Sequence, residues 1–369
     1  MTRATAVLLT LLVYKLCLIL IGLFYQRRTR DGLDFFLGGR ELGPLVAAIS
    51  ASASSSSAWT LLGVSGAAYA WGFSSLWLFP SCVGGFLINW YLLAPALRRL
   101  SRKRNALTVT ELLAGPPGSR FRQTIATTAS VIILLSLGTY VASQFQGAGK
   151  AFSETFQISL STSILLGSGI VVFYTLLGGF WAVSVTDTLQ GLLMGLTAIL
   201  LPTAALAAVG GPIPLMNGLA ALQDPAFLSM TQNLPLIGGI GLVLGLLGIG
   251  LGYPGQPHVV NRFMALKDGA GVLRRARLIA ISWSVVVYAG MLVLGLCGRL
   301  LLPALDDPEV VFVALTNSLF PPVISGVMLA AVISAIMSTA DSQLLVAGSS
   351  VTYDLRLSGT DHADMLRRS

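Results

Sequence analysis

The chain has 369 residues, of which 54% are hydrophobic and 10% are charged, and its formal net charge at pH 7 is +8. Soluble domains carry about 25% charged residues, so this composition excludes a soluble protein and indicates an integral membrane protein. The sequence has no catalytic dyad, Walker sequence or zinc-ligand spacing, and we therefore expect a protein that is not an enzyme.

Apolar stretches of about 20 residues, the length that a helix needs to cross a bilayer, dominate the sequence. Nine can be placed, near residues 4–25, 43–73, 75–97, 123–148, 159–177, 182–209, 232–252, 277–301 and 321–350. We therefore expect an all-α integral membrane protein with about nine transmembrane helices. One polytopic domain would cover residues 1–355, and residues 356–369 would form a short polar cytoplasmic tail.

The basic residues are distributed unevenly between the two sides of the membrane. If the N-terminus lies outside, 19 of the 23 Lys and Arg residues fall in inside segments, including Arg40, Arg98 to Arg104 and Arg262 to Arg277. The positive-inside rule thus predicts a multi-pass protein of the cell (inner) membrane with its N-terminus outside. The positive charge then requires no nucleic-acid partner. Lys15, within the first span, can extend its ammonium group to the membrane surface, and we assign it no functional role.

The second span is interrupted by a run of small hydroxyl residues, SASASSSSAW, at residues 50–59. Unwound backbone at membrane depth is tolerated only where it faces protein or a water-filled cavity. Secondary transporters use such broken helices to build substrate and ion sites. The stretch therefore predicts a break in the middle of a transport helix.

The seventh span, GGIGLVLGLLGIGLGYPGQPHVV at residues 238–260, is rich in glycine and contains Pro254 and Pro257. Both residue types weaken a helix and predict a second break, although close helix packing through small residues explains the glycines equally well. Two breaks five spans apart are expected for an inverted repeat of five helices. The second repeat would contain only three spans, the seventh to the ninth, so it is expected to be incomplete.

The ninth span carries two hydroxyl side chains on one helical face. Ala335, Ser338 and Thr339 are spaced i, i+3 and i+4, which places them side by side. Facing the carbonyls freed at the serine break, they would form an all-oxygen site for a monovalent cation such as sodium. The alternative is that both hydroxyls bond to carbonyls of their own helix.

Two acidic residues lie in predicted spans, where an ionised carboxylate needs a partner or a proton. Asp341 would attract a cation, exchange a proton or make a structural hydrogen bond to a neighbouring helix. Asp187, at the inner end of the sixth span, is a candidate for a cytoplasmic gate, a helix cap or an ion ligand.

Several stretches together resemble the sodium:solute symporter family, and in particular its sodium/proline symporter branch. They are LGGRELGP (37–44), AISASASSSSAWTLLGVSGA (48–67), GGFWAVSVTDTLQ (178–190), LGYPGQPHVVNRFMA (251–265) and AIMSTADSQLLV (335–346). The resemblance implies a bundle of two inverted five-helix repeats. It also implies a sodium-coupled symporter for a small organic solute, such as the amino acid proline, working by alternating access.

The same resemblance implies site residues. A sodium ion would be held by backbone carbonyls of Ala53 and Ser56, together with Ala335, Ser338 and Thr339. Solute contacts would come from Ser57, Trp59, Gly63, Tyr140, Tyr253 and Pro257. Arg40 and Asp187 match positions that the family uses for coupling and gating, and we add Ser55 and Asp341 as candidates for that role.

Two positions depart from the pattern of the proline branch. Ser55 stands where that branch typically has an aspartate important for sodium, and Ile249 stands where it has an aromatic side chain near the solute. Coupling to protons instead of sodium, and a solute other than proline, therefore stay open. We hypothesise that Asp341 partly supplies the charge that Ser55 lacks. A symporter-like membrane sensor and an inactive truncated transporter are the alternative functions.

Overall fold

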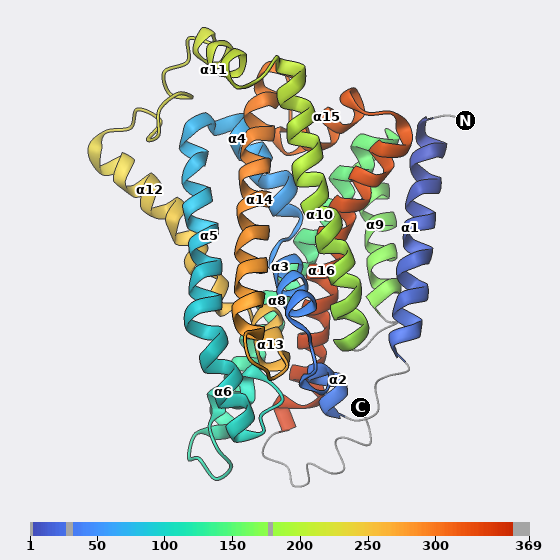
Figure 1. The fold of residues 1–369 in the computed structure, drawn as a ribbon, viewed down its shortest axis with the longest axis vertical. Coiled ribbons are helices and arrows are strands. Elements are labelled where there is room, and N and C mark those ends of the chain that lie inside the picture. Colours follow the sequence, from blue (N-terminus) through green and yellow to red (C-terminus); the bar gives the residue numbers. More distant parts are fainter. Residues whose placement is uncertain (1–2, 27–31, 176–179, 357–369) are drawn as a thin grey trace.

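The computed structural model describes residues 3–26, 32–175 and 180–356. Within these ranges the chain is almost entirely helical, and its one strand-like pairing is an isolated bridge between Leu42 and Leu266. Most long helices run side by side along the long axis of the molecule (Figure 1). The predicted all-α helical bundle is thus confirmed. Of the predicted tail, residues 357–369 lie outside the described ranges.

The break predicted in the second span is present. The elements up to this point are α1 (Arg3–Gln26), α2 (Gly32–Leu37), η1 (Gly38–Arg40), α3 (Pro44–Ser55), the π-helical turn η2 (Trp59–Gly63) and α4 (Val64–Trp71). Helix α3 ends at Ser55, and residues 56–57 have no helical hydrogen bonding before the chain coils again. The serine run therefore lies where one transport helix is divided into two halves.

The nine predicted spans all contain helix. The remaining elements are η3 (Gly72–Trp77), α5 (Leu78–Ile88), η4 (Asn89–Leu93), α6 (Ala94–Arg104), α7 (Val109–Ala114), α8 (Arg122–Phe156), α9 (Leu160–Thr175), α10 (Phe180–Val209), α11 (Pro212–Ala221), α12 (Leu236–Leu251), η5 (Tyr253–Gly255), α13 (Pro257–Ala265), α14 (Val272–Leu301), η6 (Pro308–Val310), α15 (Val311–Leu319), α16 (Pro322–Thr352) and η7 (Asp354–Arg356). Seven helical stretches of the described chain are long and apolar enough to span a membrane, and α3 and α9 are shorter apolar helices.

The interruption of the seventh span lies later than its glycine content suggests. The glycine-rich part forms the continuous helix α12, and the chain leaves the helix only at Gly252, before η5 and α13. A glycine costs a helix about 1 kcal/mol, whereas a proline costs about 3 kcal/mol. Pro254 and Pro257 therefore locate the break. Gly250 supports the packing explanation, because a Cβ atom there would lie 1.9 Å from the Ser81 carbonyl oxygen of α5.

Helix α16 lies in the centre of the bundle. In its most apolar window 83% of the residues are buried against protein, compared with 22% in α1, α8 and α12. It contacts α1, α3, α8 and α10, and α13 packs against α3 on the side of the break. The helix predicted to carry sodium ligands and both broken segments therefore meet inside the protein.

Candidate functional site

The hydroxyl face of α16 meets the broken end of α3. The Ser338 hydroxyl donates to the Ala53 carbonyl at 3.1 Å, and the Thr339 hydroxyl donates to the Ser54 carbonyl at 3.2 Å. All four residues are fully buried. Hydroxyl and carbonyl oxygens from two helices therefore converge at the point where α3 stops, which is the arrangement that a hard cation prefers.

The five residues of the expected sodium site lie around this point. Ser338 also bonds to the Ala335 carbonyl of its own helix at 3.3 Å, and the Ser56 amide donates to the Ala53 carbonyl at 3.1 Å. The alternative that both hydroxyls bond only within α16 is wrong, because Thr339 bonds across to α3 and Ser338 bonds to both helices. That these atoms hold sodium stays a prediction.

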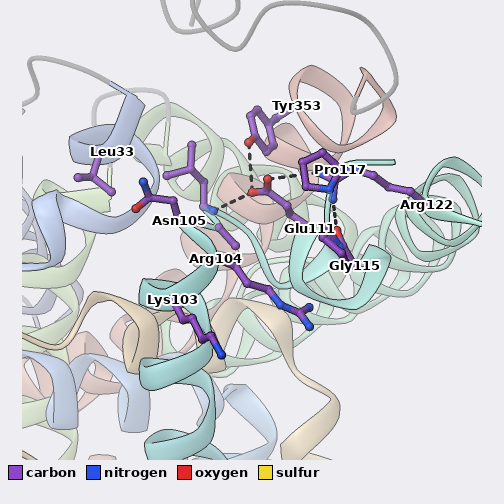
Figure 2. A pocket seen from close by; sticks show the side chains of 12 residues that line it. Leu33, Lys103, Arg104, Asn105, Glu111, Gly115, Pro117, Arg122 and Tyr353 are labelled. Carbon is purple, nitrogen blue, oxygen red and sulfur yellow. Dashed lines mark hydrogen bonds and ion pairs between the residues drawn. The ribbon is translucent and has the colours of Figure 1, made fainter. Parts of the chain in front are cut away.

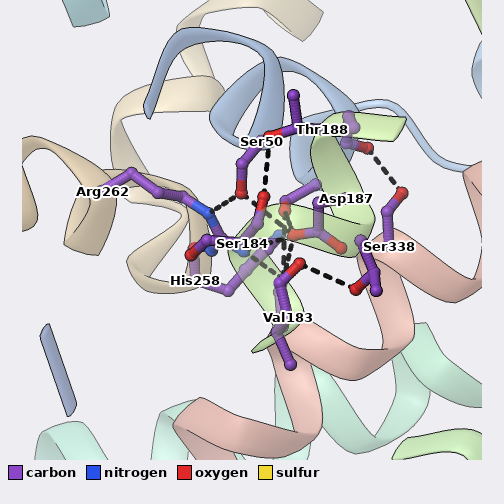
Figure 3. Close-up of polar contacts among 12 residues, drawn as sticks. Ser50, Val183, Ser184, Asp187, Thr188, His258, Arg262 and Ser338 are labelled. Atoms are coloured by element: carbon purple, nitrogen blue, oxygen red, sulfur yellow. Dashed lines mark hydrogen bonds and ion pairs between the residues drawn. The ribbon is translucent and has the colours of Figure 1, made fainter. Parts of the chain in front are cut away.

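Next to this point, Asp187 of α10 and Arg262 of α13 form a buried ion pair. The Arg262 guanidinium donates to Asp187 Oδ2 at 2.7 Å. Three serine hydroxyls bond the same oxygen: Ser50 at 3.1 Å, Ser54 at 3.0 Å and Ser342 at 3.4 Å. Figure 3 shows Ser50, Asp187 and Arg262 pointing toward one another from three different helices.

The serine run explains how these charges are accommodated. Removing an ion pair from water is costly unless its remaining hydrogen-bonding positions are filled. Ser50 and Ser54 lie one helical turn apart on α3, so both hydroxyls reach Asp187, and Ser50 also accepts from Arg262 Nε at 2.9 Å. The serine run therefore supplies the hydroxyls that solvate the ion pair, and it also contains the point, Ser55, at which α3 ends.

The partner of Asp187 is not evident from the sequence. Arg262 reads there as one of the cytoplasmic charges that set topology, yet in the structure the Arg262 side chain is almost fully buried against Phe180. A buried aspartate in an apolar span was a signal that a cation must lie nearby. The element supplying that cation could be identified only from the fold.

Lys15 also departs from its expected position. Its ammonium group does not extend to the membrane surface but contacts the Met337 sulfur of α16. The same two helices share a second contact, a hydrogen bond between Tyr14, next to Lys15, and Ser334, one turn before Met337. Asp341, fully buried and one turn beyond Met337, interacts electrostatically with Lys15 and with Arg262.

The other coupling candidates lie apart from the ion pair. The Arg40 guanidinium donates to the carbonyls of Ser101 at 3.2 Å and Ala106 at 2.9 Å, and so caps α6 at its basic C-terminal turn, Arg102 to Arg104, which marks the basic end of the bundle. Burial, and secondly the neighbouring Arg102, lower the pKa of Arg40. Ser55 bonds to the Ser52 carbonyl of its own helix at 2.9 Å. A coupling role for either residue stays a prediction.

A cavity of about 340 Å³ opens beside the second half of the broken span. Trp59 and Gly63 line it, whereas Ser57, Tyr140, Tyr253 and Pro257 are not among its lining residues. Tyr140 faces Ser57, and Tyr253 shares a hydrogen bond with Tyr288 and packs on Phe86. The structure thus brings two of the six expected solute residues to this cavity.

The family of the chain follows from comparison with known proteins. A family model described as "SSF: Sodium:solute symporter family" matches residues 35–363. This chain belongs to the sodium:solute symporter family. The prediction of a membrane transporter coupled to sodium, and not an enzyme, is thereby confirmed at the level of the family.

Relatives of this sodium:solute symporter carry names that refer to proline. The chain is 37% identical over 357 residues to the osmoregulated proline transporter of Bacillus subtilis (strain 168), covering 95% of this chain and 70% of that protein. It is 36% identical over 350 residues to the sodium/proline symporter of Staphylococcus aureus (strain JH9), covering 93% and 66% respectively. The chain thus spans about two thirds of the length of these relatives.

A solved structure shares the fold of this symporter. It is described as the substrate-bound outward-open state of a Na⁺-coupled sialic acid symporter with a novel Na⁺ site, and the TM-score is 0.80. The identity is 21%, and the match covers 98% of this chain and 76% of the other. This similarity shows the arrangement of the helices and does not identify the solute.

At the basic end of the symporter, a second cavity of about 550 Å³ lies between α6, α7, α8 and the end of α16 (Figure 2). Glu111 joins these elements, accepting from the Leu107 amide at 2.8 Å, the Tyr353 hydroxyl at 3.1 Å and Arg122 at 3.3 Å. Beside it, Asp354 accepts from Thr108 at 2.6 Å, and burial raises the pKa of Asp354 to about 6. This network attaches the end of α16 to the neighbouring helices.

Proposed function

We propose that this protein is a sodium-coupled symporter that moves a small amino-acid-like solute, with proline as the first candidate, by alternating access. Residues 1–355 would act as one transport domain. The contact between the α16 hydroxyls and the carbonyls at the break in α3 carries this proposal. It supports a sodium site at Ala53, Ser56, Ala335, Ser338 and Thr339 because oxygen atoms from both helices meet there.

Coupling follows from the position of this contact. Sodium bound there would hold the end of α3 against α16. Trp59, which lines the solute cavity, lies only a few residues beyond that end. An ion that orders the unwound segment raises the affinity for the solute, and the solute must raise the affinity for sodium equally. The Asp187–Arg262 pair, at the same junction of α3, α10, α13 and α16, would be sensitive to the same movement.

The orientation supports uptake into the cell. Helix α6, which carries Arg98 to Arg104, lies at one end of the bundle, and α1 begins at the other end (Figure 1). By the positive-inside rule the basic end faces the cytoplasm and the N-terminus lies outside. The cavity beside Trp59 would then lie on the route from outside.

The test is uptake by proteoliposomes containing the purified chain. With an inward sodium gradient we expect accumulation of labelled proline, or of another amino acid in a panel, and no accumulation without sodium. Equal uptake driven by a proton gradient alone would mean that the coupling ion is the proton and not sodium. Uptake that ignores both gradients would contradict the proposed coupling.

A further inference from the structure

Gln144 of α8 stands out at the solute cavity because its side chain is buried, polar and bonded to the unwound segment. Its side chain lines the cavity, and the residue is only 2% exposed. The carboxamide oxygen accepts a hydrogen bond from the Ala58 amide at 2.9 Å. Ala58 lies just before Trp59, so Gln144 connects α8 directly to the part of the broken helix that faces the solute.

The close approach of the two segments is built into α8. Gly147 lies one turn after Gln144, on the same face, and a Cβ atom there would lie 2.7 Å from the Ala58 side chain. A glycine at this position therefore allows the backbone of α8 to approach Ala58. Buried amide groups at membrane depth need a partner, and Gln144 supplies one for the freed Ala58 N–H.

The NH₂ group of the Gln144 carboxamide has a hydrogen-bond donor that the neighbouring protein groups in the described ranges do not use. Its NH₂ group carries two donors, and one of them reaches the Ser143 hydroxyl at the long distance of 3.4 Å. Within the described part of the chain the second donor has no protein acceptor. The same cavity contains Lys150 and Glu309, which are paired with each other. The lining thus offers a buried hydrogen-bond donor next to the unwound segment, which suits a carboxylate oxygen of a solute.

We propose that Gln144 determines the specificity of the symporter by donating a hydrogen bond to the carboxylate of the transported solute. This inference rests on the proposed function, which it deepens by naming a carboxylate-bearing amino acid as the solute class. Gln144 would position the unwound segment through its oxygen and select the solute through its nitrogen. The two tasks use different atoms of one side chain, and they can be separated by substitution.

The experiment compares Gln144→Glu with Gln146→Glu in proteoliposomes. Gln144→Glu keeps an acceptor for the Ala58 amide but loses the NH₂ donors, whereas Gln146→Glu introduces the same charge into the same cavity without a bond to Ala58. Loss of one hydrogen bond to a charged group corresponds to about a tenfold or greater change in affinity. We therefore expect Gln144→Glu to raise the KM for proline about tenfold or more.

The discriminating readout is selectivity between proline and its carboxamide, prolinamide, as competitors of labelled proline uptake. We expect the preference for proline to fall sharply in Gln144→Glu and to persist in Gln146→Glu, with the sodium dependence unchanged in both. An unchanged preference in Gln144→Glu, or an equal loss in the two variants, would overturn the role of Gln144 while leaving the proposed function standing. Wild-type protein without gradient-driven uptake of any amino acid would overturn both.

Discussion

The carboxylate of Asp187 and the guanidinium of Arg262 form an ion pair 2.7 Å long, with side chains 0% and 2% exposed. They come from α10 and α13, and the hydroxyls that surround them come from α3 and α16. Four elements distant in sequence are therefore joined by one buried charge pair. Each charge depends on the other, because neither has access to water.

Removing one partner of this pair should destabilise the protein strongly. Arg262→Gln leaves a buried carboxylate without its cation, and such losses typically cost about 3–5 kcal/mol. We expect a large fall in the melting temperature of the purified protein in detergent. The double variant Asp187→Asn/Arg262→Gln should recover part of the lost melting temperature, because no charge of the pair is left without its partner.

The matched control is the ion pair between Arg98 and Asp268, which also measures 2.7 Å but whose carboxylate side chain is 69% exposed. Exposed pairs contribute about 0–1 kcal/mol, so Asp268→Asn, at the exposed partner, should change the melting temperature little. Equal effects of Arg262→Gln and Asp268→Asn would contradict the importance given to burial.

Substitution of Asp341 tests the hypothesis that its carboxylate partly supplies the negative charge that Ser55 lacks. Asp341→Asn should lower the apparent sodium affinity several-fold, since a fixed negative charge is removed close to the proposed site. It should also destabilise the protein, because the Lys15 ammonium beside α16 loses a nearby negative charge. The double variant Lys15→Met/Asp341→Asn should recover stability but not sodium affinity. Unchanged sodium affinity in Asp341→Asn would rule the compensation out.

Local spacing was sufficient to predict the break in the second span and the hydroxyl face of α16. A serine run between apolar halves leaves few interpretations, and the i, i+3, i+4 spacing of Ala335, Ser338 and Thr339 fixes a common face without knowledge of the fold. The spacing left open whether these hydroxyls face the break or bond to their own helix. The family resemblance favoured the break, and the structure brings the two features within hydrogen-bonding distance.

The partners of buried charges could not be predicted in the same way. Arg262 and Lys15 appear in the sequence as a topological charge and a surface-seeking lysine, because positive charge near a span usually has those roles. Their actual positions depend on α13 packing against α3 and on α1 packing along α16. The break in the seventh span lies later than its glycines suggest for a simpler reason, because proline breaks helices far more strongly than glycine does.

Two glycines on α12 should respond to substitution in opposite ways. A Cβ atom at Gly250 would collide with the Ser81 backbone, whereas one at Gly248 meets nothing within 4 Å. Gly250→Ala should therefore destabilise the protein by about 1–3 kcal/mol. Gly248→Ala should be neutral, or stabilising by up to about 1 kcal/mol. Thermal unfolding of the two variants side by side measures this, and tolerance of Gly250→Ala would mean that α5 and α12 are not tightly packed.

Stability should depend on pH through Asp354. Burial raises its pKa from 3.8 to about 6, so the folded protein binds this proton more tightly than the unfolded chain does. The resulting stabilisation is present below the ordinary pKa and is lost as the pH rises through about 6. The loss amounts to roughly 2–3 kcal/mol at most.

Asp354→Asn should remove this component, so its melting temperature should fall less between pH 4 and pH 7 than that of the wild type. The Thr108 hydroxyl donates to Asp354 and the neighbouring Glu111 carboxylate acts against its ionisation, so both belong to the same network. Parallel pH profiles of the wild type and Asp354→Asn would contradict the assignment.

The sodium concentration that half-activates solute uptake, measured in Thr339→Val and Ser349→Ala, shows directly whether the hydroxyls of α16 bind sodium. Thr339→Val removes the hydroxyl that faces the Ser54 carbonyl, whereas the Ser349 hydroxyl bonds at 2.8 Å to the Val346 carbonyl of its own helix. If the α16 hydroxyls bind sodium, Thr339→Val should raise this concentration about tenfold or more, and Ser349→Ala should leave it unchanged. The same sodium dependence in Thr339→Val, Ser349→Ala and the wild type would contradict a sodium site at the break in α3.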